Sequence, residues 1–227
     1  MQVGQQLSPP KITLKTKGLS EKQKDLVRLA INQDNKIIFI AGPAGSTKTY
    51  VAVYSALKQL KANDSLDLLY VRTVIESAEK GLGALPGNID EKFNPYMAPL
   101  DDKLRELLPA TTGVVADLIK KQRVQAMPIN YLRGANWTNK VVIADEAQNF
   151  TYKELTTLIT RLGENSQLFI CGDYMQSDIN GRSGFKDIYN LFDDSKSKEQ
   201  GIHCFAFGLA DIKRSKILSY IIKKLSQ

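Results

Sequence analysis

Residues 36–50 read KIIFIAGPAGSTKTY, and the rest of the chain is interpreted from this segment. The apolar run at 37–40 predicts a buried strand, because it is too short for a helix of ordinary length. A glycine-rich turn follows the run, and residues 50–60 have the pattern of a helix. A strand, a glycine-rich turn ending in Lys-Thr, and a helix are the context that a phosphate-binding loop (P-loop) requires. Such a loop holds a nucleotide phosphate with successive backbone N–H groups and the positive end of the helix dipole.

The P-loop prediction gives each residue of the turn a role. Lys48 would reach the β- and γ-phosphates, and the Thr49 hydroxyl would hold Mg²⁺. Thr47 departs from the usual pattern GxxxxGK[ST], which has glycine at this position. Glycine there carries no Cβ penalty, so a threonine must adopt tolerable backbone angles or weaken the site. The alternative is an ordinary strand-to-helix turn. The candidate nucleotide-binding residues are Gly42, Pro43, Ala44, Gly45, Ser46, Thr47, Lys48, Thr49 and Tyr50.

The composition is that of an ordinary globular chain. The 227 residues are 43% hydrophobic and 24% charged, without an 18-residue apolar run or a secretory leader, so we expect a cytoplasmic protein outside the membrane. Cys171 and Cys204 are the two cysteines, which suggests neither a zinc site nor a disulfide framework, and we expect both in buried strands. The sole histidine, His203, excludes a histidine-based metal cluster and a Ser-His triad. A net charge of +7 favours a polyanionic partner.

A second motif lies at 141–146, where the sequence VVIADE predicts a buried strand that ends in two carboxylates. This is the Walker B arrangement of P-loop proteins. Asp145 would hold magnesium through water, and Glu146 would orient or deprotonate the attacking water. Taken alone, the run is better explained as a strand leading into a helix cap. Its place about 100 residues after the P-loop favours the catalytic interpretation.

A third motif, LFICGD at 168–173, predicts another strand and is followed by Gln176. Asp173 and Gln176 match the γ-phosphate sensor of helicase-type ATPases, whereas the alternative is a turn capped by Asp173. Upstream, Ser20 and Gln23 have the spacing of a capping box at the start of a helix. Gln23 also lies 19 residues before Gly42, where superfamily 1 helicases carry a glutamine that contacts adenine. The two roles of Gln23 stay open at this stage.

The remaining chain is predicted in outline. We expect strands at 66–72 and 203–207, a short one near 125–131, and a helix at 152–162. An insertion at 73–135 should hold helices at 101–108, after Pro95 and Pro99, and at 113–121. Residues 1–17 are expected to be a flexible or edge-strand lead-in to one domain, 18–227. Beyond the last strand, a basic amphipathic helix carries Arg214, which is a candidate arginine finger or a surface residue.

Together these residues resemble the PhoH family of P-loop ATPases, over roughly residues 19–220. The resemblance extends to Val71-Arg72, Leu85-Pro86-Gly87, DEAQN at 145–149 and TRLG at 160–163. It implies a RecA-like α/β fold, a parallel sheet between helices with a superfamily 1 helicase-like core and an insertion. Two departures are Thr47 and the sequence RGAN at 133–136, where the family tends to have Arg-Gly-Arg-Thr. The chain looks like the minimal ATPase core, a form found in bacteria and phages, so the cytoplasm is bacterial or that of a phage's host.

The resemblance further implies ATP and Mg²⁺ as ligands and a homo-oligomeric ring, most simply a hexamer. In a ring, a neighbouring subunit would supply the arginine finger, for which Arg161 and Arg214 are the candidates. We therefore expect ATP hydrolysis coupled to RNA or, less strongly, single-stranded DNA. Two alternatives stay open. A nucleotide-dependent assembly scaffold would follow if Thr47 impaired turnover, and a small-molecule kinase would need a lid and an acceptor site.

Overall fold

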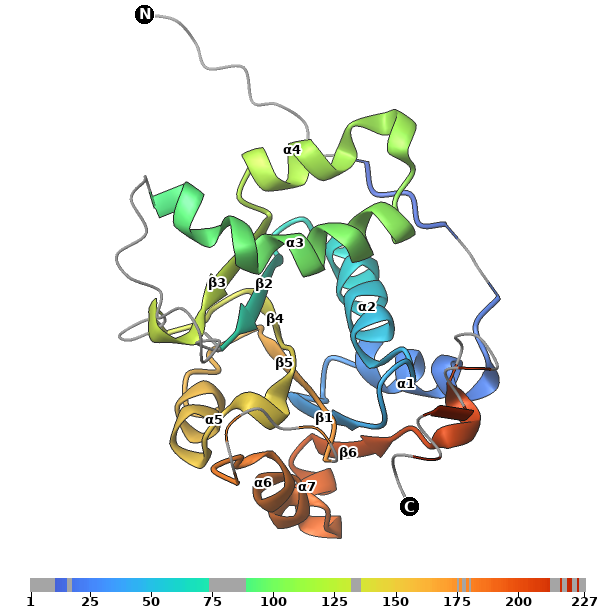
Figure 1. Cartoon of the computed structure of the whole chain (residues 1–227). Helices are drawn as coiled ribbons and strands as arrows, with labels where there is room; N and C mark the ends of the chain where they lie inside the picture. The colour runs from blue at the N-terminus through green and yellow to red at the C-terminus, as the bar shows by residue number, and fades with distance from the viewer. Residues whose placement is uncertain are drawn as a thin grey trace, which may run out of the picture.

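The computed structural model describes residues 11–15, 18–73, 89–131, 136–174, 176, 179, 181–212, 217, 220, 221 and 224. Its centre is a sheet of six parallel strands in the order β3-β2-β4-β5-β1-β6 (Figure 1). The strands are β1 (Ile37–Ala41), β2 (Asp67–Arg72), β3 (Val124–Pro128), β4 (Lys140–Ala144), β5 (Gln167–Gly172) and β6 (Ile202–Ala206). Parallel strands need crossover connections, and helices provide them here.

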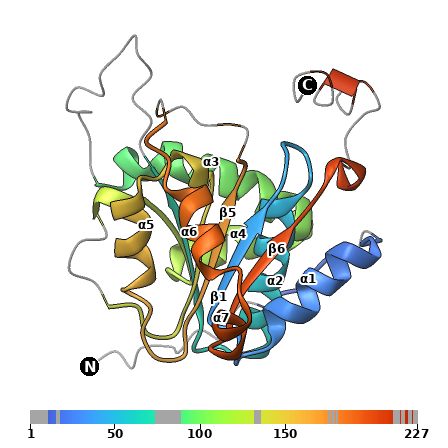
Figure 2. The same cartoon turned by 90° about the horizontal axis from the view of Figure 1, so that it is seen from below.

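Helices cover both faces of the sheet (Figure 2). One face is covered by α1 (Glu21–Ile31), α2 (Lys48–Ala62), α3 (Ile89–Leu107) and α4 (Val114–Lys120), and the other by α5 (Tyr152–Ile159) and α6 (Phe185–Phe192). A short α7 (Ser195–Glu199) precedes β6, and 3₁₀ turns occupy Ala110–Thr112, Ile129–Tyr131, Ala147–Asn149 and Leu209–Asp211. No described helix is long and apolar enough to span a membrane.

Strand β1 shows why its residues are almost all apolar. Ile38 and Ile40 belong to the hydrophobic core under α1 and α2, whereas Ile37 and Phe39 belong to the core under α5 and α6. Successive side chains of a strand point to opposite faces, so a central strand covered on both sides must be apolar at every position. The apolar run at 37–40 is therefore buried within the sheet, between β5 and β6.

The strand order brings the three motifs together. β4, β5 and β1 are consecutive in the sheet, and Ala41 pairs with Gly172 while Ala144 pairs with Ile170. All strands are parallel, so the segments that follow β1, β4 and β5 emerge side by side at one edge. Ligands of open α/β sheets bind beyond the carboxyl ends of the strands. The RecA-like fold expected from the sequence is confirmed.

Several predicted elements need correction. α3 begins at Ile89 and contains Pro95 and Pro99, whereas the sequence had predicted a helix only from 101, after both prolines. A proline inside a helix removes one N–H and is costly, so the helix must be held by packing. Leu100 and Leu104 are fully buried in the core with α2, which supplies that packing. α6 and α7 had not been predicted.

The ends of the chain are described in part. Residues 11–15 form neither helix nor strand, and Ile12 is buried in the core while the Lys15 N–H donates to the Leu107 carbonyl at 2.8 Å. The predicted basic helix after β6 falls largely outside the described residues. The four residues of it that are described, at 217, 220, 221 and 224, are helical and exposed. Both cysteines are free and lie in strands; Cys171 is buried and Cys204 only partly.

Candidate active site

The loop between β1 and α2 is tightly folded on itself. Gly45 and Thr47 have left-handed backbone conformations, with φ of 78° and 69°. Ser46 is fully buried, and its hydroxyl donates to the Pro43 carbonyl at 2.7 Å. A Cβ added to Gly42 would lie 2.8 Å from the Ser46 hydroxyl oxygen, so glycine is required at the start of the loop. The first N–H groups of α2, which have no acceptor within the helix, face the same space as the loop.

The Lys48 side chain folds back over this loop. Its Nζ donates to the carbonyl of Gly42 at 2.6 Å and to that of Pro43 at 3.1 Å. The two carbonyls thus hold the ammonium group beside the helix N-terminus, where an anion is favoured. The loop therefore offers a positive site made by one side chain and backbone N–H groups.

Asp145 joins the loop to the sheet. Its Oδ1 accepts a hydrogen bond from the Thr49 hydroxyl at 2.6 Å, and its Oδ2 accepts one from the Tyr70 hydroxyl of β2. Tyr70 is completely buried. Burial, and then the adjacent Asp145 carboxylate, raise the pKa of Tyr70 far above its ordinary value, so the phenol stays protonated and remains a donor.

Glu146 lies at the mouth of the site in a left-handed conformation, with φ of 55° and ψ of 45°. The buried Gln148 donates from Nε2 to Glu146 Oε2 at 2.6 Å and accepts at Oε1 from the Asp173 N–H at 3.0 Å. Arg72, at the end of β2, forms an ion pair with Glu146 at 3.8 Å. Gln148 thus connects the carboxylate after β4 to the loop after β5.

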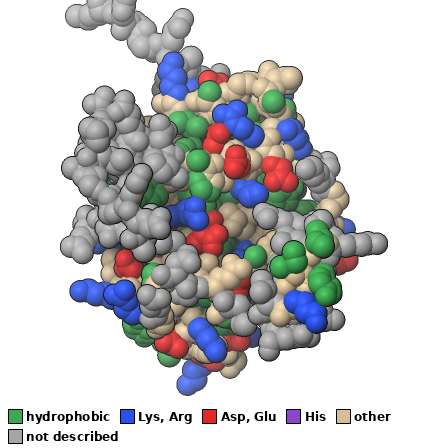
Figure 3. All heavy atoms as spheres, in the orientation of Figure 1, with side chains coloured by type: hydrophobic (Ala, Val, Ile, Leu, Met, Phe, Trp, Pro, Cys, Tyr) green, Lys and Arg blue, Asp and Glu red, His purple; other side chains and the backbone are tan. Residues whose placement is uncertain are grey.

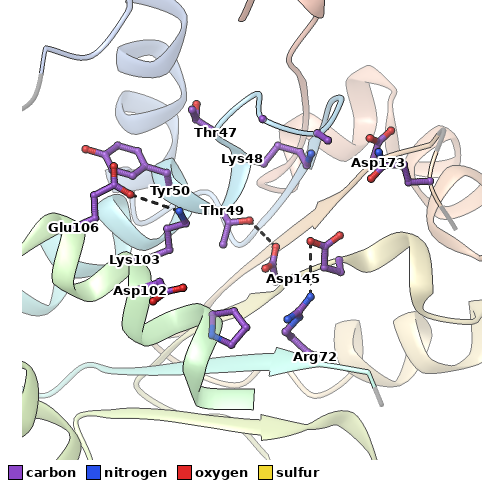
Figure 4. Close-up of a pocket in the computed structure, with 15 residues that line it drawn as sticks. Thr47, Lys48, Thr49, Tyr50, Arg72, Asp102, Lys103, Glu106, Asp145 and Asp173 are labelled. Atoms are coloured by element: carbon purple, nitrogen blue, oxygen red, sulfur yellow. Dashed lines mark hydrogen bonds and ion pairs between the residues drawn. The ribbon is translucent and has the colours of Figure 1, made fainter. Parts of the chain in front are cut away.

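These groups surround one cavity of about 740 Å³ (Figure 4). The P-loop and the starts of the loops after β2, β4 and β5 form one wall, and α3 forms the other. In Figure 4 Lys103 points toward Glu106 near Tyr50, and the ion pair between Lys103 and Glu106 is 3.5 Å long. The cavity is lined by Ala44, Gly45, Thr47, Lys48, Thr49, Tyr50, Arg72, Pro99, Asp102, Lys103, Glu106, Asp145, Glu146, Asp173 and Gln176.

Most predicted site residues line this cavity, including Asp173 and the exposed Gln176. Gly42, Pro43 and Ser46 form the body of the loop beneath them. Gln23 is absent from the lining: it completes the capping box with Ser20 and donates to the Thr47 hydroxyl.

Of the two candidate finger residues, Arg161 is described and does not line the cavity. Arg161 follows α5, and its carbonyl accepts from the Trp137 N–H at 3.1 Å. This places Arg161 near the amino ends of β4 and β5, opposite the edge that holds the cavity. Arg214 lies outside the described residues.

Sequence reasoning missed the α3 wall, Arg72 and Gln148 as parts of the site. A usable signal existed for α3: residues 102, 103 and 106 are charged and share one helical face, while 100, 104 and 107 are leucines on another. Arg72 and Gln148 lie in the segments 71–72 and 145–149 that carry the family resemblance, but no role was predicted for them. The role of Tyr70 could not be predicted, because its hydrogen-bond partner, Asp145, is 75 residues away in the sequence.

The donor set fits magnesium. The Thr49 hydroxyl and the Asp145 carboxylate are hard oxygen groups within 2.6 Å of each other. Mg²⁺ prefers oxygen ligands and usually binds one or two protein groups together with phosphates and waters. Among the described residues, no group of three or more histidine, cysteine or acidic side chains is placed so that it could hold a metal ion.

Comparison with known proteins identifies relatives of the whole chain. The family model described as PhoH-like protein matches residues 15–226. A PhoH-like protein of Synechocystis sp. is 33% identical over 193 residues, which cover 84% of this chain and 57% of that protein. A PhoH-like protein of Bacillus subtilis is 33% identical, covering 93% and 66%, and Protein PhoH of Escherichia coli K12 is 33% identical, covering 88% and 55%. The chain thus spans little more than half the length of most of these relatives.

Solved structures show a more distant similarity. The Pif1 helicase of Candida albicans matches 85% of this chain and 40% of its own, with a TM-score of 0.40 and 15% identity. The Pif1 of a Bacteroides species, solved in complex with ADP-AlF4, matches 85% of this chain and 42% of its own, with a TM-score of 0.38 and 15% identity.

Proposed function

The chain belongs to the family of PhoH-like proteins, and on this basis we propose that it binds and hydrolyses ATP with Mg²⁺. One observation carries the proposal. Lys48, Thr49, Asp145 and Glu146, from segments almost 100 residues apart, line the same cavity at the carboxyl ends of the strands. A phosphate-binding loop, a metal-holding hydroxyl and carboxylate, and a second carboxylate are the groups that phosphoryl transfer to water requires.

We assign each of these residues a role in binding phosphate or activating water. Lys48 exchanges the Gly42 and Pro43 carbonyls for phosphate oxygens, and the N–H groups at the start of α2 hold the same phosphates. Glu146 orients a water molecule for attack on the γ-phosphate and accepts its proton. Gln148 and Arg72 fix the Glu146 carboxylate from two sides. Asp173 and Gln176 line the same cavity, and we assign to them the sensing of the terminal phosphate.

Thr49 and Asp145 would hold Mg²⁺, which supplies neutralisation of the charge that develops on the phosphate oxygens. The Tyr70 hydroxyl keeps the Asp145 carboxylate in one orientation, so Oδ1 faces the Thr49 hydroxyl and the cavity. Neither Thr49 nor Asp145 needs to move far to share an ion, because their oxygens already lie 2.6 Å apart.

We further propose that hydrolysis is coupled to RNA or single-stranded DNA in a homo-oligomeric ring. The net charge of +7 supports a polyanionic partner. Among the described residues on the face seen in Figure 1, Figure 3 shows Lys and Arg side chains interspersed with Asp and Glu. Arg161 lies far from its own cavity and would therefore act as a finger only in a neighbouring subunit, and Arg214 is the second candidate.

The experiment that tests the proposal measures steady-state ATP turnover, with and without single-stranded RNA or DNA, together with ADP binding. Glu146→Gln removes the base and keeps the shape, so turnover should fall by at least about 10²-fold while ADP still binds. Glu199→Gln, the same change at an exposed position of α7, is the control and should leave turnover unchanged.

The other outcomes separate the alternatives. Wild-type turnover that rises with nucleic acid and collapses in Glu146→Gln supports a nucleic-acid motor. Nucleotide binding without turnover in any variant would refute the hydrolase and support an assembly scaffold. Full turnover in Glu146→Gln would refute the assigned role of that carboxylate.

A further inference from the structure

The unusual feature of the P-loop is the backbone of Thr47. Its φ of 69° and ψ of 18° lie in the left-handed region, and it precedes Lys48 at the N-terminus of α2. A β-branched residue rarely adopts this conformation, which is why glycine is usual here. The Thr47 side chain makes no capping bond to its own helix. Something outside the loop must therefore help to keep Thr47 in this conformation.

Gln23 of α1 makes that contact. Its Nε2 donates to the Thr47 hydroxyl oxygen at 2.7 Å, across 24 residues of sequence. The Gln23 side chain is itself fixed, because its Oε1 accepts from the Ser20 N–H at 2.8 Å. The Gln23 backbone N–H separately donates to the Ser20 hydroxyl at 3.3 Å and completes the capping box. Gln23 is 5% exposed, so its Nε2 group is shielded from water and is held toward the Thr47 hydroxyl. A threonine offers the acceptor that a glycine at position 47 would lack.

The same two contacts also set the orientation of the Gln23 amide. A glutamine that reads adenine uses its oxygen to accept from the N6 amino group and its nitrogen to donate to N7. Here one lone pair of the oxygen accepts from the Ser20 N–H and one of the two N–H groups donates to Thr47, so the protein itself orients the amide. The Thr47 hydroxyl still has its own proton to donate, and Thr47 lines the cavity.

We propose that Gln23 is a positioning residue of the phosphate loop: it holds Thr47 in its left-handed conformation, so that Lys48 and the following N–H groups stay aimed at phosphate. This inference rests on the proposed binding of ATP. It explains how the loop tolerates a threonine: the side chain that disfavours the left-handed conformation also carries the hydroxyl to which Gln23 donates.

A double-mutant cycle tests the proposal. Binding of fluorescently labelled ADP and GDP would be measured by titration for the wild type, Gln23→Met, Thr47→Gly and the double variant. Loss of one hydrogen bond should weaken ADP binding by about 5- to 10-fold in Gln23→Met. With glycine at position 47 there is no hydroxyl to hold, so Gln23→Met should then change affinity by about 2-fold or less. The ratio of ADP to GDP affinity should be the same in the wild type and in Gln23→Met.

Ser20→Ala is the matched control, because it removes the Ser20 hydroxyl from the capping box without touching the bond to Thr47. It should lower the melting temperature and leave ADP affinity within about 2-fold. An equal loss on Gln23→Met in the wild-type and Thr47→Gly backgrounds, no loss at all, or a loss confined to ADP over GDP would overturn the proposal. Failure of both the wild type and Thr47→Gly to bind any nucleotide would instead overturn the proposed function on which it rests.

Discussion

Replacing Tyr70 by phenylalanine removes one hydroxyl from the centre of the protein. That hydroxyl donates to Asp145, and Tyr70 is fully buried while Asp145 is 5% exposed. The substitution leaves the ring packing in place, so the loss is that of a buried hydrogen bond to a charged group. Such bonds contribute about 1.5 to 3 kcal/mol, and we expect Tyr70→Phe to lower the free energy of unfolding by about 2 kcal/mol near neutral pH. For a chain of this size that corresponds to a fall of about 4–8 °C in melting temperature.

The pH dependence makes this prediction specific. The pKa of Tyr70 is raised in the folded protein, so above about pH 10 the unfolded chain releases this proton while the folded chain retains it. The stabilisation by the Tyr70 hydroxyl is therefore fully present below about pH 10 and is lost as the pH rises. One group contributes a slope of about 1.4 kcal/mol per pH unit, so the difference between wild type and Tyr70→Phe should shrink by about 1.4 kcal/mol between about pH 8 and 11.

The assay is urea unfolding followed by far-UV circular dichroism at the two pH values. Tyr152→Phe is the control, since Tyr152 is half-exposed on α5 and should change the free energy of unfolding by less than about 0.5 kcal/mol. A Tyr70→Phe variant as stable as the control at the lower pH would refute the assigned hydrogen bond. A difference that stays constant or grows toward the higher pH would refute the assigned protonation.

Two further predictions concern the end of β5 and the connection from the segment that follows it to Glu146. Gly172→Ala would place a Cβ 2.5 Å from the buried ring of Phe185 and should lower the free energy of unfolding by about 1–3 kcal/mol. Gly18→Ala is the control: a Cβ there would have nothing within 4 Å and should cost less than about 0.5 kcal/mol. Equal melting temperatures of the two variants would contradict the packing. Gln148→Met removes the bond from Gln148 to Glu146 and the bond from the Asp173 N–H to Gln148. ATP turnover should then fall by about 10-fold or more, with ADP affinity nearly unchanged. A loss confined to ADP affinity would show that Gln148 serves binding instead.

The sequence predicted the sheet and the main motifs well because these depend on local patterns. Apolar runs at 37–40, 141–144 and 168–171 are buried strands, and the residues that follow them meet because all three strands are parallel neighbours. The helix that carries Pro95 and Pro99 could not be placed from local preferences, because its packing on α2 outweighs the cost of the prolines.

The contacts that complete the site depend on distant pairs, which a single sequence does not reveal. Tyr70 looked like one more apolar strand residue until β2 and β4 were paired and its hydroxyl met Asp145. Gln23 had two predicted roles, a cap and a base contact. The structure shows the cap together with a contact that had not been considered, to the residue that replaces the loop glycine.

These contacts share one consequence for nucleotide binding. Lys48 donates to two carbonyls of its own loop, and Thr49 donates to Asp145. A phosphate or a metal ion must displace these bonds, so binding exchanges one set of partners for another and yields less free energy than the new contacts alone would suggest. Tyr70 and Gln23 bond to Asp145 and Thr47 from outside the cavity, where no ligand needs to displace them. The hydrogen bonds from Tyr70 and Gln23 can therefore persist while Lys48 and Thr49 exchange their partners for the nucleotide and its metal ion. In this way a loop with a threonine in place of glycine can keep its geometry during binding.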